Sequence, residues 1–84
     1  MNRGEVYVLI DDERAVQAAQ WQAPHYWGEG DCSSQNVAAI VKSAVLTEEC
    51  GEVARAVLEL DSAAVRRELV QVAAVAVAWL ESLP

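Results

Sequence analysis

Apolar residues recur with helical periodicity in three segments of the chain. In the first, residues 4–21, the run GEVYVLI has the composition of a strand, but Val6, Leu9 and Val16 also share one face of a helix. We predict a helix here. The next run, QAPHYWGEGDCSS at residues 22–34, holds a proline, two glycines and several turn-forming residues. We predict a loop for this run.

The second segment, residues 35–60, follows Ser33 and Ser34, either of which can cap a helix. Its first half carries an apolar stripe, and the same helical face continues into carboxylates. The stripe consists of Val37, Val41, Ala44 and Val45, and it continues to Glu48 and Glu52. Gly51 in the middle of this helix costs about 1 kcal/mol relative to alanine. We therefore expect the third segment to approach Gly51 closely, and we expect Cys50 to pack on the apolar side.

The third segment, residues 63–82, is apolar nearly all round over residues 69–80. Asp61 and the serine after it supply the turn and the cap. A helix without a polar face has to be buried on every side, and three helices cannot surround it in a chain of 84 residues. We therefore predict a single all-α domain over residues 1–84, in which antiparallel helices form a bundle that a homodimer or homotetramer completes.

Composition and charge exclude several classes of function. Six Lys and Arg against 13 Asp and Glu give a net charge of −7, which repels nucleic-acid backbones, so we expect no nucleic-acid partner. Cys32 and Cys50 are too few for a disulfide scaffold, and no Cys/His pair has zinc-ligand spacing. The apolar run at 69–80 is shorter than the roughly 20 residues of a membrane span. The N-terminal apolar run VYVLI is followed at once by Asp11, Asp12 and Glu13, so it is too short for a signal peptide. We expect a soluble, cytoplasmic protein.

Carboxylate and amide side chains lie one helical turn apart on the second and third segments. They are Glu48, Glu49 and Glu52 on the second, and Glu68 and Gln71 on the third. Spacings of three and four place side chains on one helical face, so two antiparallel helices can direct these oxygens to one point. Magnesium prefers oxygen ligands and often bridges protein carboxylates to substrate phosphates. From spacing alone, a solvated acidic face is the more common explanation, with Glu68 favourable near its helix N-terminus.

Two motifs carry a resemblance to a known family: EECGE at residues 48–52 and, after a gap of 15 residues, ELVQVAAVAVAWLE from residue 68. They resemble the MazG-like all-α nucleotide pyrophosphohydrolases, whose pattern is EExxE followed by ExxD. The upstream ERAVQAAQW, at residues 13–21, is similar to the ERxRQxxxW opening of short stand-alone members, which phages and mobile gene cassettes often carry. The resemblance is strongest over residues 45–83. This chain departs from the pattern at Gln71, where the family has aspartate.

The resemblance implies cleavage between the α and β phosphates of a nucleoside triphosphate, which releases a nucleoside monophosphate and pyrophosphate. Glu49, Glu52 and Glu68 would hold magnesium, for which manganese can substitute, and Gln71 would be the fourth ligand. Glu48 would position or deprotonate the attacking water. An amide at position 71 offers an oxygen but no charge. The alternative is therefore a non-catalytic helical oligomer that binds a nucleotide or a protein partner.

The sequence gives weaker evidence for the residues that contact a substrate. Lys42 and Arg55 can contact phosphates, although Arg55 is equally well placed to pair with an acidic residue of its own helix. Trp21 and Trp27 can stack on a base or fill the edge of a small core. His25 lies in the predicted loop, where it is either a substrate contact or an ordinary loop residue, because one histidine without a partner defines no chemistry.

Overall fold

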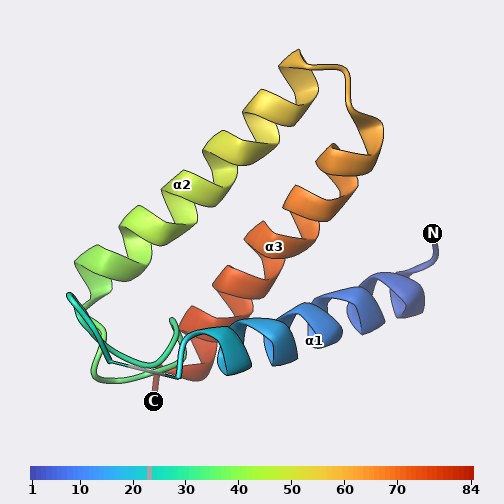
Figure 1. Ribbon diagram of the computed structural model, residues 1–84. Helices are drawn as coiled ribbons and strands as arrows, with labels where there is room; N and C mark the ends of the chain where they lie inside the picture. Colours follow the sequence, from blue (N-terminus) through green and yellow to red (C-terminus); the bar gives the residue numbers. More distant parts are fainter. Residues whose placement is uncertain (23) are drawn as a thin grey trace.

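The computed structural model of the chain describes residues 1–22 and 24–84 and contains three helices with a two-stranded hairpin (Figure 1). The helices are α1 (Arg3–Gln20), α2 (Ala39–Leu58) and α3 (Ser62–Glu81), and the strands are β1 (Pro24–His25) and β2 (Gly28–Glu29). The predicted all-α fold is confirmed. The predicted loop, residues 22–34, contains the antiparallel hairpin of β1 and β2. Residue 23 lies outside the described residues.

The N-terminal end of α1 is set by Asn2. Its side-chain oxygen accepts a hydrogen bond from the Glu5 backbone N–H at 2.9 Å, and its amide nitrogen donates to Glu5 Oε1 at 2.8 Å. The first bond satisfies the Glu5 N–H, one of the backbone donors that a helix start otherwise leaves unpaired, and the second holds the Asn2 side chain in place. The ambiguous GEVYVLI run is therefore helical, and the prediction over residues 4–21 is correct to within one residue at each end.

The second helix is shorter than predicted. It begins at Ala39 instead of residue 35 and ends at Leu58 instead of residue 60. Its N-cap is Ala38, whose side chain makes no capping hydrogen bond. Val37, which belongs to the apolar stripe in the sequence, is only 4% exposed, but it lies in the loop before α2. The burial of a loop residue therefore gave the same apolar signal as the first turn of a helix.

The two serines that were predicted as caps stabilise the loop instead. Ser33 donates from its N–H and its hydroxyl to Asp31 Oδ1, and the Ser34 hydroxyl accepts from the Asn36 N–H at 3.0 Å. Gly28 closes the other side of the loop with a φ of 145°, and a Cβ there would collide with the carbonyl oxygen of Asn36. Only glycine fits both the dihedral angle and the close approach.

Hydrogen bonds fix both sides of the turn between α2 and α3. The Asp61 N–H donates to Ala56 O and the Leu60 N–H donates to Val57 O, both at 3.1 Å, which is the Schellman pattern of a helix end. Leu60 occupies the left-handed position of this motif, with a φ of 55°. The Asp61 side chain accepts from the Ala64 N–H at 3.0 Å, so the predicted cap of the third helix is confirmed.

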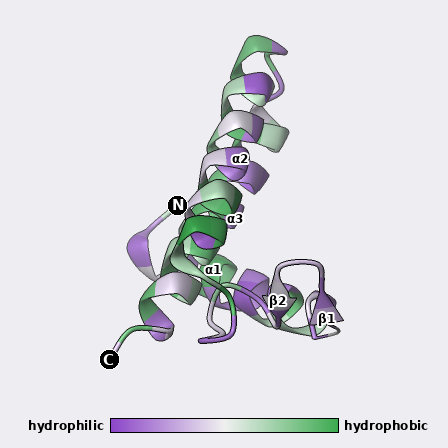
Figure 2. Cartoon of the chain, turned by 90° about the vertical axis from the view of Figure 1, so that its left-hand side faces the viewer, coloured by the Kyte–Doolittle hydropathy of each residue, from purple (hydrophilic) through white to green (hydrophobic). Residues whose placement is uncertain are grey.

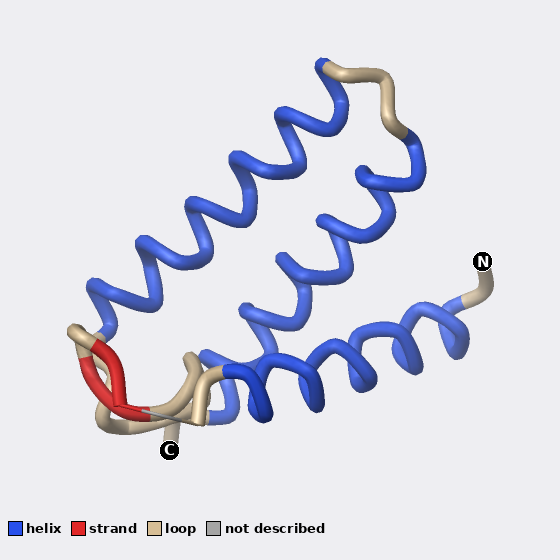
Figure 3. The backbone as a smooth tube through the Cα atoms, viewed as in Figure 1, coloured by secondary structure: helices blue, strands red, loops and turns tan. Residues whose placement is uncertain are grey.

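α3 packs against both other helices, whereas α1 and α2 do not contact each other within the described residues (Figures 1 and 3). The buried apolar residues are few and mostly small: Cys32, Val37, Ala56, Ala74, Val75 and Ala78. Apolar residues recur along α2 and α3 beyond this core (Figure 2), and Leu69 and Leu80 are 52% and 67% exposed. The chain therefore leaves part of α3 uncovered. None of the helices in residues 1–22 and 24–84 is long and apolar enough to cross a membrane.

Two predictions about the middle of α2 are wrong. A Cβ added at Gly51 would meet no atom of the described residues within 4 Å, so no backbone in that part of the chain approaches it. Cys50 is exposed instead of packed. The physical reason is that α3 covers only one side of α2, the side that carries the buried Ala56.

Candidate functional site

Three of the predicted site residues converge between α2 and α3. Gln71, in the middle of α3, places its side-chain amide beside the carboxylates of Glu49 on α2 and Glu68 on α3. In the orientation that satisfies its hydrogen bonding, the Gln71 nitrogen donates to Glu49 Oε2 at 2.9 Å and to Glu68 Oε2 at 3.0 Å. This orientation is assigned from the neighbouring acceptors. The spacings in the sequence therefore do bring these side chains to one point.

Negative charge is concentrated around Glu49. Burial raises the pKa of its carboxyl, and the nearby charges of Glu68, Glu48, Glu52 and Glu13 raise it further, in that order. Each of these effects disfavours the ionised carboxylate. A cation, a proton or a hydrogen-bond donor at this point would relieve the repulsion.

Glu48 and Glu52 do not join the pair of carboxylates. Glu48 is exposed, and the Glu52 carboxylate lies 3.9 Å from Arg55 Nη1 on its own helix. Among the residues that the structure describes, no group of three or more His, Cys, Asp or Glu side chains is arranged to hold a metal ion. Two carboxylates and an amide nevertheless fit magnesium, which often takes one or two carboxylates and completes its coordination with water and substrate phosphates.

A cavity of about 310 Å³ adjoins this point. It lies between α1 and α2, with residues of α3 and of the loop completing its wall. Glu48, Glu49 and Gln71 line it, together with Trp21 and Trp27. A space of this size is at the lower end of the range for small-ligand sites. It combines acidic groups with aromatic surface, as a site for a metal-bound nucleotide would.

Residues of α1 that were not predicted as site residues also line the cavity. Glu13 and Gln17 line it, one helical turn apart. Both belong to the ERAVQAAQW motif, so the resemblance held the signal, whereas the spacing of the carboxylates on the second and third segments did not include them. Glu13 also adds its charge to the environment of Glu49.

His25 packs against both tryptophans of the cavity wall, whose own ring centroids are 6.2 Å apart. Its ring lies edge-on to Trp21, with centroids 4.8 Å apart, and is stacked on Trp27 at 5.4 Å. His25 Nε2 is buried and has no hydrogen-bond partner in the described part of the chain. His25 does not line the cavity itself. Its contacts fix the positions of the two indole rings.

The two predicted phosphate-binding cations lie away from the cavity. Lys42 is only 4% exposed, and its Nζ donates to the Ser82 hydroxyl at 2.7 Å, which in turn donates to Trp79 O at 2.6 Å. This chain of hydrogen bonds closes the C-terminal end of α3, where a positive charge is favourable. Arg55 is exposed and pairs loosely with Glu52. Neither residue lines the cavity.

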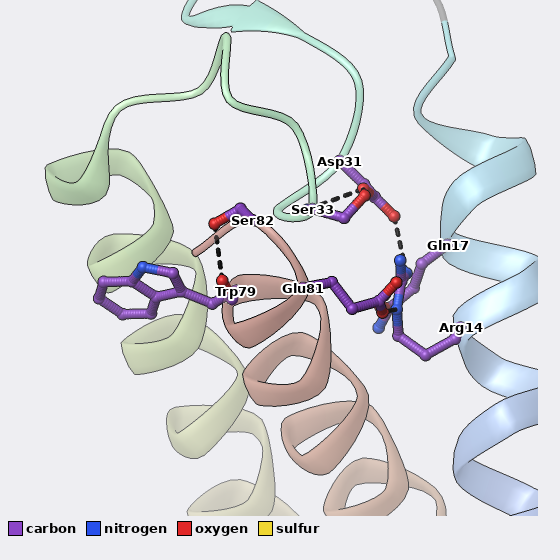
Figure 4. Close-up of polar contacts among 7 residues, drawn as sticks. All are labelled: Arg14, Gln17, Asp31, Ser33, Trp79, Glu81 and Ser82. Atoms are coloured by element: carbon purple, nitrogen blue, oxygen red, sulfur yellow. Dashed lines mark hydrogen bonds and ion pairs between the residues drawn. The ribbon is translucent and has the colours of Figure 1, made fainter. Parts of the chain in front are cut away.

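Arg14 ties together the three segments around the cavity (Figure 4). Its Nη1 lies 2.7 Å from Asp31 Oδ2 in the loop, and its Nε lies 2.7 Å from Glu81 Oε1 near the end of α3. Burial alone would raise the pKa of Asp31, but hydrogen bonds from Ser33 and Arg14 and the Arg14 charge outweigh it and lower that pKa. The arginine of the ERAVQAAQW motif therefore holds the loop in place.

Comparisons of this chain with protein-family models, with curated proteins and with solved structures give no match.

Proposed function

We propose that this chain is a magnesium-dependent nucleoside triphosphate pyrophosphohydrolase, which releases a nucleoside monophosphate and pyrophosphate. The observation that supports it most directly is the convergence of Glu49, Glu68 and Gln71 beside the cavity that Trp21 and Trp27 also line. The motif resemblance supplies the reaction. The convergence supplies ligands for a metal, and the indole rings supply flat surfaces for a base.

In this proposal each residue has a separate task. The carboxylates of Glu49 and Glu68 would hold the metal, with Gln71 as a neutral neighbour. Glu52, one turn further along α2, would be a third ligand in place of its pairing with Arg55. A magnesium ion held there would neutralise the phosphates and stabilise the charge that develops during cleavage. Glu48, which lines the cavity beside Glu49, orients or deprotonates the attacking water.

The second candidate function is a non-catalytic protein that binds a nucleotide or a protein partner. The observation that favours it is the amide of Gln71, which satisfies both carboxylates without any metal. A neutral amide also binds a divalent cation less strongly than the aspartate of the family pattern.

A panel of nucleoside triphosphates with magnesium separates the two functions, with pyrophosphate release as the signal. We expect turnover in the wild type and its loss in Glu48→Gln and Glu49→Gln. Glu59→Gln is the matched control, because Glu59 is exposed at the end of the same helix and does not line the cavity. No pyrophosphate from any nucleotide, together with saturable nucleotide binding, would instead support the non-catalytic function.

We also propose that the active form is a homodimer or homotetramer. The chain exposes 5750 Å², whereas a folded monomer of 9.1 kDa exposes about 4,900 Å². The excess of about 850 Å² is close to the area that one partner contributes to a standard interface, about 800 Å². Sedimentation at micromolar concentration should therefore detect an oligomer. A single species with the mass of one chain would contradict this part of the proposal.

A further inference from the structure

The side-chain amide of Gln71 lies between two carboxylates that belong to different helices. In the orientation assigned from these neighbours, its two N–H bonds point to Glu49 Oε2 and Glu68 Oε2. Hydrogen bonds to ionised acceptors are stronger than neutral ones. The amide therefore joins α2 to α3 by giving one donor group to two like charges, of which Glu68 also has Arg67 Nε at 4.0 Å from its Oε1.

An aspartate at this position could not make these contacts, because an ionised carboxylate only accepts hydrogen bonds. It would instead add a further negative charge to a point that Glu13, Glu48 and Glu52 already make unfavourable for Glu49. A site with aspartate at position 71 needs a cation to hold its carboxylates together. The site of this chain does not.

The same amide can also turn its acceptor oxygen towards the two carboxylates. A glutamine carries a donor nitrogen and an acceptor oxygen at nearly equal positions. The terminal torsion of glutamine is broad and roughly two-fold, so the two orientations interconvert with little change elsewhere in the side chain. After such a turn the Gln71 oxygen would lie beside the same two carboxylate oxygens. Three converging oxygens are stable only around a cation or a shared proton.

We propose that Gln71 is a two-position switch: its nitrogen holds Glu49 and Glu68 together in the metal-free protein, and its oxygen faces the site when a divalent cation binds. This inference rests on the proposed function to the extent that the carboxylate pair has to bind magnesium. It makes Gln71 a positioning residue that keeps the site assembled between turnovers and competes with the metal for the two carboxylates.

Nitrogen-15 NMR of the side-chain amides of the wild-type protein tests the switch directly, with magnesium alone as the probe. The Gln71 signal is identified by its loss in Gln71→Met. Without magnesium we expect its protons to exchange with water about tenfold more slowly than those of the other glutamines, because both N–H bonds are engaged. At saturating magnesium we expect this protection to disappear and the signal to shift. Gln20 is an internal control, because it lines the same cavity from α1, whereas the assigned hydrogen bonds to the two carboxylates come from Gln71.

The outcomes distinguish this inference from the function on which it rests. If magnesium shifts the backbone signals of Glu49 and Glu68 while the Gln71 amide keeps its protection, the metal binds without the turn and the switch is wrong. If the Gln71 protons exchange freely in the absence of magnesium, the metal-free half of the switch is wrong. If magnesium shifts no signal at all, the metal site itself is absent, and both the switch and the proposed enzymatic function fail.

Discussion

Replacing Arg14 by methionine should destabilise the fold, because it leaves the Asp31 carboxylate buried without its ion-pair partner. The Asp31 carboxylate is 8% exposed and the Arg14 side chain 11% exposed, whereas Glu81 is 51% exposed. Removing one partner of a buried ion pair costs about 3–5 kcal/mol, because the other charge stays buried. The half-exposed Glu81 pair contributes only about 0–1 kcal/mol. We therefore expect a loss of about 3 kcal/mol, which corresponds to about 12–24 °C in Tm for a domain of this size.

Urea denaturation of four proteins measures this coupling: wild type, Arg14→Met, Asp31→Asn and the double variant. The double variant should recover most of the loss, because asparagine fills the same space without a charge. Arg66→Met is the control, since Arg66 is exposed on α3 and makes no ion pair within the described residues. The lowered pKa of Asp31 means that its stabilising effect is complete above its ordinary value of 3.8 and is lost as the pH falls through the folded pKa. If the losses of the two single variants simply add in the double variant, Arg14 and Asp31 are not coupled and the argument is refuted.

Three further predictions concern the turn and the carboxylates. Leu60→Gly should stabilise the fold by about 0.5–1 kcal/mol in thermal denaturation, because the strain of a left-handed leucine exceeds the entropy that glycine loses on folding. A lower Tm would contradict this and show that the Leu60 side chain, 92% exposed in this chain, packs in an interface. The pKa of Glu49 is raised in the folded protein. Its contribution to the free energy of unfolding is therefore complete below the ordinary value of 4.5 and is lost as the pH rises through the folded pKa. Glu49→Gln should therefore remove that part of the pH dependence in urea denaturation, and an unchanged profile would contradict it. Gln71→Asp should tighten magnesium binding in calorimetry, through the added charge, and destabilise the metal-free protein through the loss of two donors; equal or weaker binding would exclude position 71 as a direct ligand.

The accuracy of the predicted helix boundaries follows the strength of the local signals. The first and third helices were correct to within one residue at each end, and their starts are set by Asn2 and Asp61, side-chain caps that lie next to the residues they stabilise. The second helix was predicted to start four residues too early. Its true N-cap, Ala38, has no capping side chain, and the burial of Val37 depends on the packing of the loop. Nothing in the local sequence reports such packing.

In the candidate site, too, contacts that follow from helical spacing could be predicted, whereas contacts between residues far apart in the sequence could not. Helical spacing was sufficient to predict that Glu49, Glu68 and Gln71 meet, because the turn at Asp61 fixes how α2 lies against α3. The partner of Lys42 could not be predicted, since Ser82 lies 40 residues away in the sequence. The same holds for the contact of Arg14 with Asp31, which joins residues 17 apart across the loop.

Gln71 illustrates why a departure from a motif has to be interpreted with its contacts. From the sequence, glutamine in place of aspartate is only the loss of a charge, which favours a weaker metal site. The two hydrogen bonds to Glu49 and Glu68 add a gain, because glutamine supplies the donors that an assembled but metal-free pair of carboxylates requires. In the proposed function the loss would weaken the metal-bound state and the gain would strengthen the metal-free state, so both would reduce the apparent affinity for magnesium. A low affinity measured for the wild type is therefore not by itself an argument against catalysis, and the rate at saturating magnesium is the quantity that separates an enzyme from a binding protein.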